Sequence, residues 1–115
     1  IGEVLDKAKE SLSALDGREY FTLIAEMLKK YAQPGQGEIC FNERDLNRLP
    51  EGFEETISEI AGAKGGGLTL SQTPCGIGGG FILVYGGIEE NCSFDSVFPY
   101  EKERLQDRIH EMLFA

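Results

Sequence analysis

A glycine-rich run is the part of the sequence whose composition comes closest to a ligand-binding loop. Residues Gly76–Gly80 read GIGGG, which has the composition of a phosphate-binding loop. Such loops lead from a strand into a helix whose amino end holds the anion. Here the glycines precede the strand-like run Phe81–Tyr85, and no Lys or Arg occurs between Lys64 and Lys102. We therefore interpret the run as a loop or bulge before a strand and expect no bound cofactor.

A second motif, Gly62-Ala63-Lys64-Gly65, matches the G-x-x-G loop of KH RNA-binding modules. In those modules the loop joins two helices, whereas here a strand is predicted to follow it. The chain has 20 acidic and 11 basic residues and a formal net charge of −9. This charge opposes the binding of nucleic acid or anionic lipid, which depends on Lys and Arg. A KH-like nucleic-acid-binding module remains an alternative, but no nucleic-acid partner and no membrane insertion are expected.

Residues that could catalyse a reaction or bind a metal are few. His110 is the only histidine, and the sequence places no nucleophile or second ligand beside it. The cysteines, Cys40, Cys75 and Cys92, are odd in number and widely spaced, which disfavours a disulfide framework or zinc site and fits a reducing cytosol.

Four glutamates near the start of a predicted helix fit a solvated acidic face better than a catalytic pair. They are Glu51, Glu54, Glu55 and Glu59. We therefore predict a non-enzyme without catalytic, cofactor-binding or metal-binding residues. A small-molecule-binding enzyme domain is kept as an alternative that a deep polar pocket beside Gly76–Gly80 would support.

Hydrophobic spacing predicts the elements of the first half of the chain. Asp16 and Glu19 form a capping box before a helix that ends near Pro34. A short strand over residues 38–41 and a brief helix over 43–49, capped by Asn42, come next. A third helix follows, with Pro50 at its first position.

The second half reads as three strands and a helix. The strands cover residues 68–72, 81–85 and 88–92, and we expect them to be antiparallel, with the 81–85 strand covered on both faces. Ser93 precedes the last helix, which is predicted to turn at residues 94–98 and restart at Pro99. The fold class is α+β, with a small, mainly antiparallel sheet of about four strands packed with helices.

The amino-terminal residues form a heptad stripe. Its members, spaced by four and three, are Ile1, Leu5, Ala8, Leu12 and Leu15. An amphipathic helix packed on its own domain would give the same pattern. We expect residues 1–15 to be the end of a longer coiled-coil helix and residues 16–115 to form a globular domain. An isolated fragment is then predicted to form homodimers through the stripe.

The stretch Gly78–Asp95, GGGFILVYGGIEENCSFD, resembles the C-terminal region of the E subunit of V-type and A-type rotary ATPases. The order of elements resembles that family over essentially the whole chain. The resemblance implies a peripheral-stalk, or stator, component that is non-catalytic and cytoplasmic, peripheral to the membrane. It implies pairing with the G subunit (H in some archaea) through the amino-terminal helix and contact with the B and A subunits of the catalytic head. ATP synthesis or hydrolysis would thereby stay coupled to proton or other ion transport.

Overall fold

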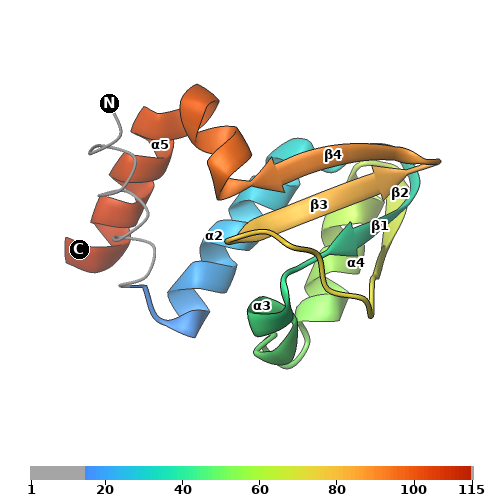
Figure 1. The fold of residues 1–115 in the computed structure, drawn as a ribbon, viewed down its shortest axis with the longest axis horizontal. Coiled ribbons are helices and arrows are strands. Elements are labelled where there is room, and N and C mark those ends of the chain that lie inside the picture. Colours follow the sequence, from blue (N-terminus) through green and yellow to red (C-terminus); the bar gives the residue numbers. More distant parts are fainter. Residues whose placement is uncertain (1–14, 115) are drawn as a thin grey trace.

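The computed structural model describes residues 15–114, which form one sheet packed with helices (Figure 1). In chain order the elements are α2 (Gly17–Tyr31), β1 (Gly35–Cys40), α3 (Glu43–Asn47), α4 (Phe53–Ala63), β2 (Gly66–Leu70), β3 (Gly80–Tyr85), β4 (Ile88–Ser93) and α5 (Phe94–Phe114). The α+β class is therefore confirmed. The predicted heptad residues Ile1, Leu5, Ala8 and Leu12 lie outside the described residues.

Helix α2 begins as the sequence predicts. The Glu19 backbone N–H donates to Asp16 Oδ1 at 2.8 Å, and the Asp16 N–H donates back to the Glu19 carboxylate, which completes the capping box. Lys29 and Lys30 lie in the last turn, where a positive charge interacts favourably with the helix dipole. One face of the helix is buried along its length, so α2 is the main helix of the core.

The sheet has the order β2-β1-β3-β4. Strands β1 and β3, and β3 and β4, are antiparallel, but β2 pairs in parallel with β1. Strand β2 runs opposite to β3, as expected for antiparallel strands, but the two are not neighbours, so the prediction that the last three strands form one antiparallel set is wrong in the pairing of β2. The segment between β1 and β2 contains two helices, and this is the kind of crossover that a parallel pair needs. The loop after β2 then carries the chain to the other side of β1.

Strand β3 is central, but it is not covered on both faces by helices among residues 15–114, which corrects the prediction. Helices α2 and α4 lie behind the sheet in Figure 1. Phe81 and Leu83 are buried on the core side, whereas Ile82 and Val84 alternate to the opposite face and are half-buried. Val84 is paired there with Glu38 and Glu89, so this face has a polar border.

Four phenylalanines from separate elements join the layers of the core. Phe21 of α2 meets Phe53 of α4 with ring centroids 5.1 Å apart, and Phe41 after β1 meets Phe81 of β3 at 6.3 Å. Phe41 also contacts Phe21 and Phe53, and every pair is edge-on. Such packing adds a specific geometry to apolar burial and fixes the two helices on the sheet.

Helix α5 begins directly after Ser93, so the predicted turn at residues 94–98 is wrong. Phe94, Val97 and Phe98 are buried at helical spacing, and their packing favours a helix in this segment. The break comes at Glu101, whose backbone angles are φ −125° and ψ 20°. Pro99 lies two residues before this break, but its ring and missing N–H act on the turn that precedes it, so they do not explain the non-helical angles at Glu101.

The link between α3 and α4 also departs from prediction in one detail. Asn42 caps α3 as expected, accepting from the Asp45 N–H at 2.7 Å. Pro50 is not the first residue of α4, because the chain makes a turn in which the Phe53 N–H donates to the Pro50 carbonyl. Gly52 ends this turn with φ 81°, a left-handed conformation that glycine adopts without a steric penalty.

Candidate functional site

Gly79 and Gly80, the last two glycines of residues 76–80, allow close packing in this fold. They lead into strand β3 and not into a helix, as expected. Gly80 has φ 86°, and a Cβ atom there would lie 2.6 Å from the Cys92 carbonyl oxygen. A Cβ on Gly79 would lie 3.0 Å from the Phe94 ring. The absence of side chains therefore allows β3 to approach β4 and α5 closely.

The G-x-x-G motif ends a helix. Lys64 is the C-cap of α4, Gly65 takes the left-handed conformation with φ 83°, and β2 begins at Gly66. This is a common glycine-assisted helix terminus. It differs from the helix-to-helix loop of a KH module, and the prediction that a strand follows is confirmed.

The remaining candidates for catalysis or metal binding form no common site within residues 15–114, although the thiols of Cys40 and Cys75 are close enough to share a hydrogen bond. His110 is exposed on α5, and its ring contacts Phe114 with centroids 4.7 Å apart. Within residues 15–114, no group of three or more His, Cys, Asp or Glu side chains is arranged to hold a metal ion. The cysteines are free thiols. Burial raises the pKa of the Cys92 thiol to about 12, and the nearby carboxylates of Glu90 and Glu101 add to this effect.

A buried polar cluster instead joins α2, α3 and β3. Asp45, only 2% exposed, accepts a hydrogen bond from the Tyr20 hydroxyl at 2.6 Å and from Arg48 Nε at 2.9 Å. The Gly80 N–H donates to the Tyr20 oxygen at 3.0 Å. The Arg48 guanidinium also lies over the Tyr20 and Phe21 rings. Burial raises the pKa of Tyr20, and the hydrogen bond to Asp45 raises it further, so the phenol stays protonated as donor.

A second polar cluster fixes the kink of α5 against α2. The Glu101 carboxylate, 5% exposed, accepts hydrogen bonds from Lys30 and Tyr31 and lies 3.4 Å from Arg104 Nε. Burial alone would raise the pKa of Glu101, but these donors outweigh it and the pKa is lowered. Further along, Arg108 makes a two-pronged bond to Glu26, with distances of 2.8 and 2.7 Å. These contacts hold the kink of α5, and the arm that follows it, on α2.

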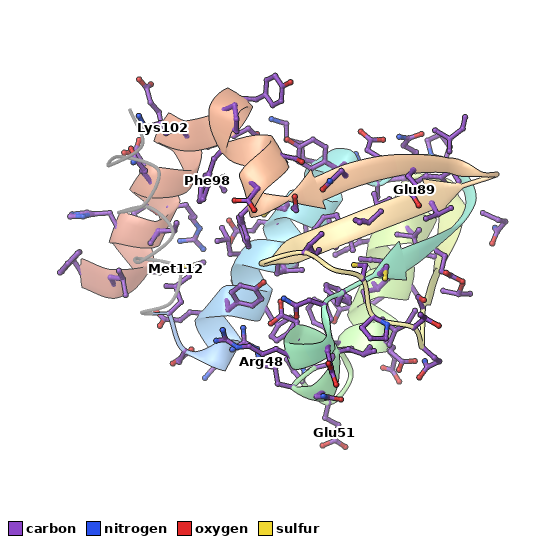
Figure 2. All side chains as sticks on the ribbon, in the orientation of Figure 1. Arg48, Glu51, Glu89, Phe98, Lys102 and Met112 are labelled. Atoms are coloured by element: carbon purple, nitrogen blue, oxygen red, sulfur yellow. The ribbon has the colours of Figure 1, made fainter. Side chains whose placement is uncertain are left out.

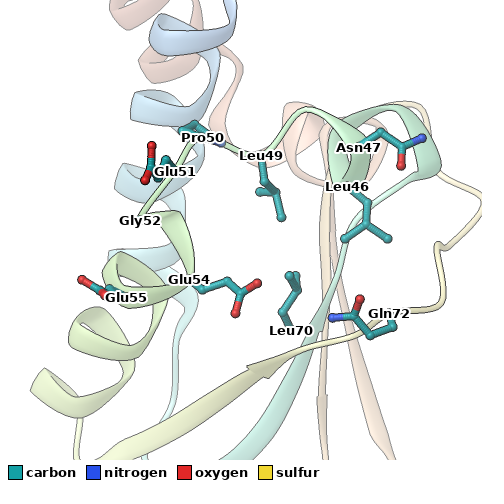
Figure 3. A pocket seen from close by; sticks show the side chains of 10 residues that line it. All are labelled: Leu46, Asn47, Leu49, Pro50, Glu51, Gly52, Glu54, Glu55, Leu70 and Gln72. Carbon is teal, nitrogen blue, oxygen red and sulfur yellow. The ribbon is translucent and has the colours of Figure 1, made fainter.

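A surface hollow of about 630 Å³ lies between the α3–α4 link, the start of α4 and the end of β2. Leu49 and Leu70 point toward each other across it in Figure 3, and the carboxylate of Glu54 and the carboxamide of Gln72 point into it. Two other hollows, of about 560 and 290 Å³, lie between α2 and α4 and beside β2. Residues 76–80 line none of these three hollows.

The predicted exposure of the acidic residues is correct, since Glu54, Glu55 and Glu59 of α4 and Glu51 in the turn before it are all exposed. Sequence reasoning missed the Tyr20–Asp45 and Glu101 clusters, because these pairs form only when distant elements pack. The spacing of Asp45 and Arg48, three positions apart in a short helix, was the one local signal. Leu15 is the residue of the predicted interface stripe that lies within the described part of the chain. It is 6% exposed and belongs to the hydrophobic core. The role of the stripe stays a prediction.

No helix among residues 15–114 has the length and apolar character to cross a membrane. No family model matches the chain. Comparison with curated proteins gives clear relatives that are E subunits of V-type ATPases or ATP synthases. The chain is therefore similar to E subunits over nearly its whole length.

Three relatives show the extent of this similarity. The V-type ATP synthase E subunit of Acetivibrio thermocellus is 34% identical over 105 residues, covering 90% of this chain and 53% of the relative. The V-type ATP synthase E subunit of Clostridium botulinum is 32% identical over 117 residues, covering 100% of the chain and 59% of the relative. The V-type proton ATPase E subunit of Thermoanaerobacter pseudethanolicus is 29% identical over 116 residues, covering 99% of this chain and 58% of the relative. The chain spans little more than half the length of these relatives.

Proposed function

We propose that the chain is the globular C-terminal part of a peripheral-stalk component in a V-type rotary ATPase or ATP synthase. The observation that carries this proposal is the similarity to the E-subunit family, which extends over nearly the whole chain. In this role the domain holds the catalytic head, made of the A and B subunits, against the torque of the rotor. ATP turnover then stays coupled to ion translocation, with the chain acting as a non-catalytic, cytoplasmic component peripheral to the membrane.

The packing of α5 supports a load-bearing role. Glu101 and Arg108 bond to Lys30, Tyr31 and Glu26 on α2, so two separate polar contacts hold the last helix. Charge-assisted and two-pronged bonds of this kind are directional and resist sliding of one helix along the other. A domain that transmits force between subunits needs such resistance.

Reconstitution tests the proposal. The chain is mixed with A and B subunits that have been isolated without their E subunit, and the mixture is separated by size. Co-elution with the head is expected. If the chain co-elutes with neither the head nor a fragment of the G subunit, the proposed function is wrong.

The amino-terminal stripe has its own part in this proposal. We propose that Ile1, Leu5, Ala8 and Leu12 pack against the helix of the G subunit, and that the isolated chain uses them to form homodimers. Leu15, the last residue of the stripe, packs in the core of its own domain. Sedimentation of the wild-type chain should show dimers whose fraction rises with concentration. The variant Leu5→Asp should reduce both dimers and binding of a G-subunit fragment, because a carboxylate in an apolar seam loses its hydration. A wild-type monomer at all concentrations would contradict the homodimer.

A further inference from the structure

The hollow at the end of β2 is lined by both apolar and acidic side chains. Leu46, Leu49 and Leu70 line it and are only partly buried, so covering them would remove apolar surface from water. Glu54 and Gln72 extend into the same space from opposite sides (Figure 3). The hollow therefore offers an apolar surface for the methylene groups of a long side chain and a carboxylate for a charged group at the end of that side chain.

The charge around the hollow has one sign. Its lining includes Glu51, Glu54 and Glu55 and no Lys, Arg or His. None of these three glutamates makes an ion pair with another described residue. The nearby Arg48 is turned inward to Asp45 and the Tyr20 ring. In Figure 2, Arg48 and Glu51 are labelled at this lower end of the molecule, where Glu51 extends outward.

We propose that this hollow binds a lysine or arginine side chain from a basic segment of another protein in the same complex. The stem of the side chain lies on Leu46, Leu49 and Leu70, and its cation pairs with Glu54. Long basic side chains bury their methylene groups on apolar surface in this manner while the charged end meets a carboxylate. The partner assignment rests on the proposed function; the chemistry of the hollow does not.

A protein segment fits the observations better than a free cation. The leucines supply contacts along the length of a side chain, which an inorganic ion cannot use. The adjoining hollow beside β2, about 290 Å³ in volume, shares Glu54 and Leu70 with the first, so a continuous segment can place neighbouring residues in both. Glu51 and Glu55 provide negative potential around the entrance, which speeds the encounter with a basic surface.

Two variants of α4 form a matched pair for the test. Glu54 and Glu55 both lie in the first turn of the helix, and both are exposed. Figure 3 shows Glu54 pointing into the hollow and Glu55 pointing away from it. The changes Glu54→Gln and Glu55→Gln remove the same charge at the same end of the helix, so their effects on folding and on general attraction are similar. A difference between them reports on the hollow itself.

Binding to the A, B and G subunits is measured for wild type and both variants. Loss of a desolvated ion pair predicts that Glu54→Gln weakens binding about tenfold or more, whereas Glu55→Gln changes it by about threefold or less. Equal binding by the two variants would contradict the proposed binding of a basic side chain in the hollow, while leaving the proposed stalk function intact.

A second measurement does not depend on the complex. The tripeptide acetyl-Leu-Arg-Leu-amide is titrated into the chain, and the methyl NMR signals of Leu46, Leu49 and Leu70 are followed. The chemical shifts of these signals should change when this peptide is added. They should not change with a control peptide in which neutral citrulline replaces the arginine. If wild type binds none of the subunits but the methyl signals move, the stalk function fails and the hollow stands. The proposed binding in the hollow would be contradicted if both peptides caused equal chemical-shift changes or none. Chemical-shift changes confined to other residues would also contradict it.

Discussion

Tyr20 and Asp45 meet in the core although they belong to different helices, with the Tyr20 hydroxyl 2.6 Å from Asp45 Oδ2. Tyr20 also accepts from the Gly80 N–H, and Asp45 also accepts from Arg48. A single hydroxyl thereby links α2, α3 and the first residue of β3. The cluster is fully bonded, which is the condition under which buried polar groups stabilise a unique packing.

Replacement of Tyr20 tests this link. Tyr20→Phe leaves the Gly80 N–H without its acceptor and Asp45 without one donor, so the free energy of unfolding should fall by about 1–3 kcal/mol. Urea denaturation followed by circular dichroism measures the change. Tyr100→Phe is the matched control because Tyr100 is 87% exposed, and it should leave stability unchanged. Equal stability of the two variants would show that the Tyr20 hydroxyl contributes nothing.

Gly80 should tolerate no side chain. Gly80→Ala forces a Cβ to within 2.6 Å of the Cys92 carbonyl oxygen at a backbone φ of 86°. Strain of this kind costs about 1–3 kcal/mol, so the midpoint of thermal unfolding should fall clearly. Gly76→Ala is the control, because a Cβ there meets no atom within 4 Å. A midpoint for Gly80→Ala equal to that of the control would contradict the close approach of β3 and β4.

The lowered pKa of Glu101 should make the free energy of unfolding depend on pH. Its pKa in the folded chain is lowered from the ordinary value of 4.5, because the hydrogen bonds from Lys30 and Tyr31 and the charge of Arg104 outweigh the effect of burial. Its contribution is therefore full above about pH 4.5 and is lost as the pH falls through the lowered pKa.

The variant Glu101→Gln should consequently be less stable than wild type at pH 7, and the difference should shrink below about pH 4.5. Urea titrations at several pH values measure this difference. Glu103→Gln, at an exposed position on the same helix, serves as the control and should show no such trend. A wild-type advantage over Glu101→Gln that is constant with pH would mean that the carboxylate is not held as described.

The buried thiol of Cys92 and the half-buried thiol of Cys75 should resist alkylation. Burial raises the pKa of Cys92 to about 12, and that of Cys75 also to about 12, where a hydrogen bond with Cys40 adds to the effect. Because the thiolate is the reactive form, iodoacetamide at about pH 7.5 should modify Cys75 and Cys92 slowly in the folded chain. In guanidinium chloride both should react quickly. Mass spectrometry of peptides measures the rates, and fast labelling of native Cys92 would contradict its burial.

Local signals in the sequence predicted the local features correctly. The Asp16 capping box, the Asn42 cap, the Gly86-Gly87 turn and the exposed glutamates of α4 all depend on residues close together in the chain. The partner of β2 could not be found this way. Alternation marks a half-buried strand, but it carries no information about which neighbour the strand pairs with.

Other errors share this physical origin. The apolar run at residues 81–85 looks the same whether a strand is buried on one face or on both, and the position of Ile82 and Val84 follows from the one-sided helical layer. Helix α5 continues through residues 94–98 because three apolar side chains pack there, which outweighs the local effect of Pro99. The hollow around Glu54 joins residues from α4 and the end of β2, so no single window of sequence shows it.

The strand order has a consequence for how the chain assembles. The two central strands are separated in sequence by α3, α4 and β2, so Ile39 can meet Leu83 only after a long loop has closed. Local contacts form fast and distant ones slowly, and the joining of β1 to β3 should therefore limit the rate of folding. During synthesis, until β3 leaves the ribosome, the emerging chain presents β1 as an open template to which a stray strand can attach.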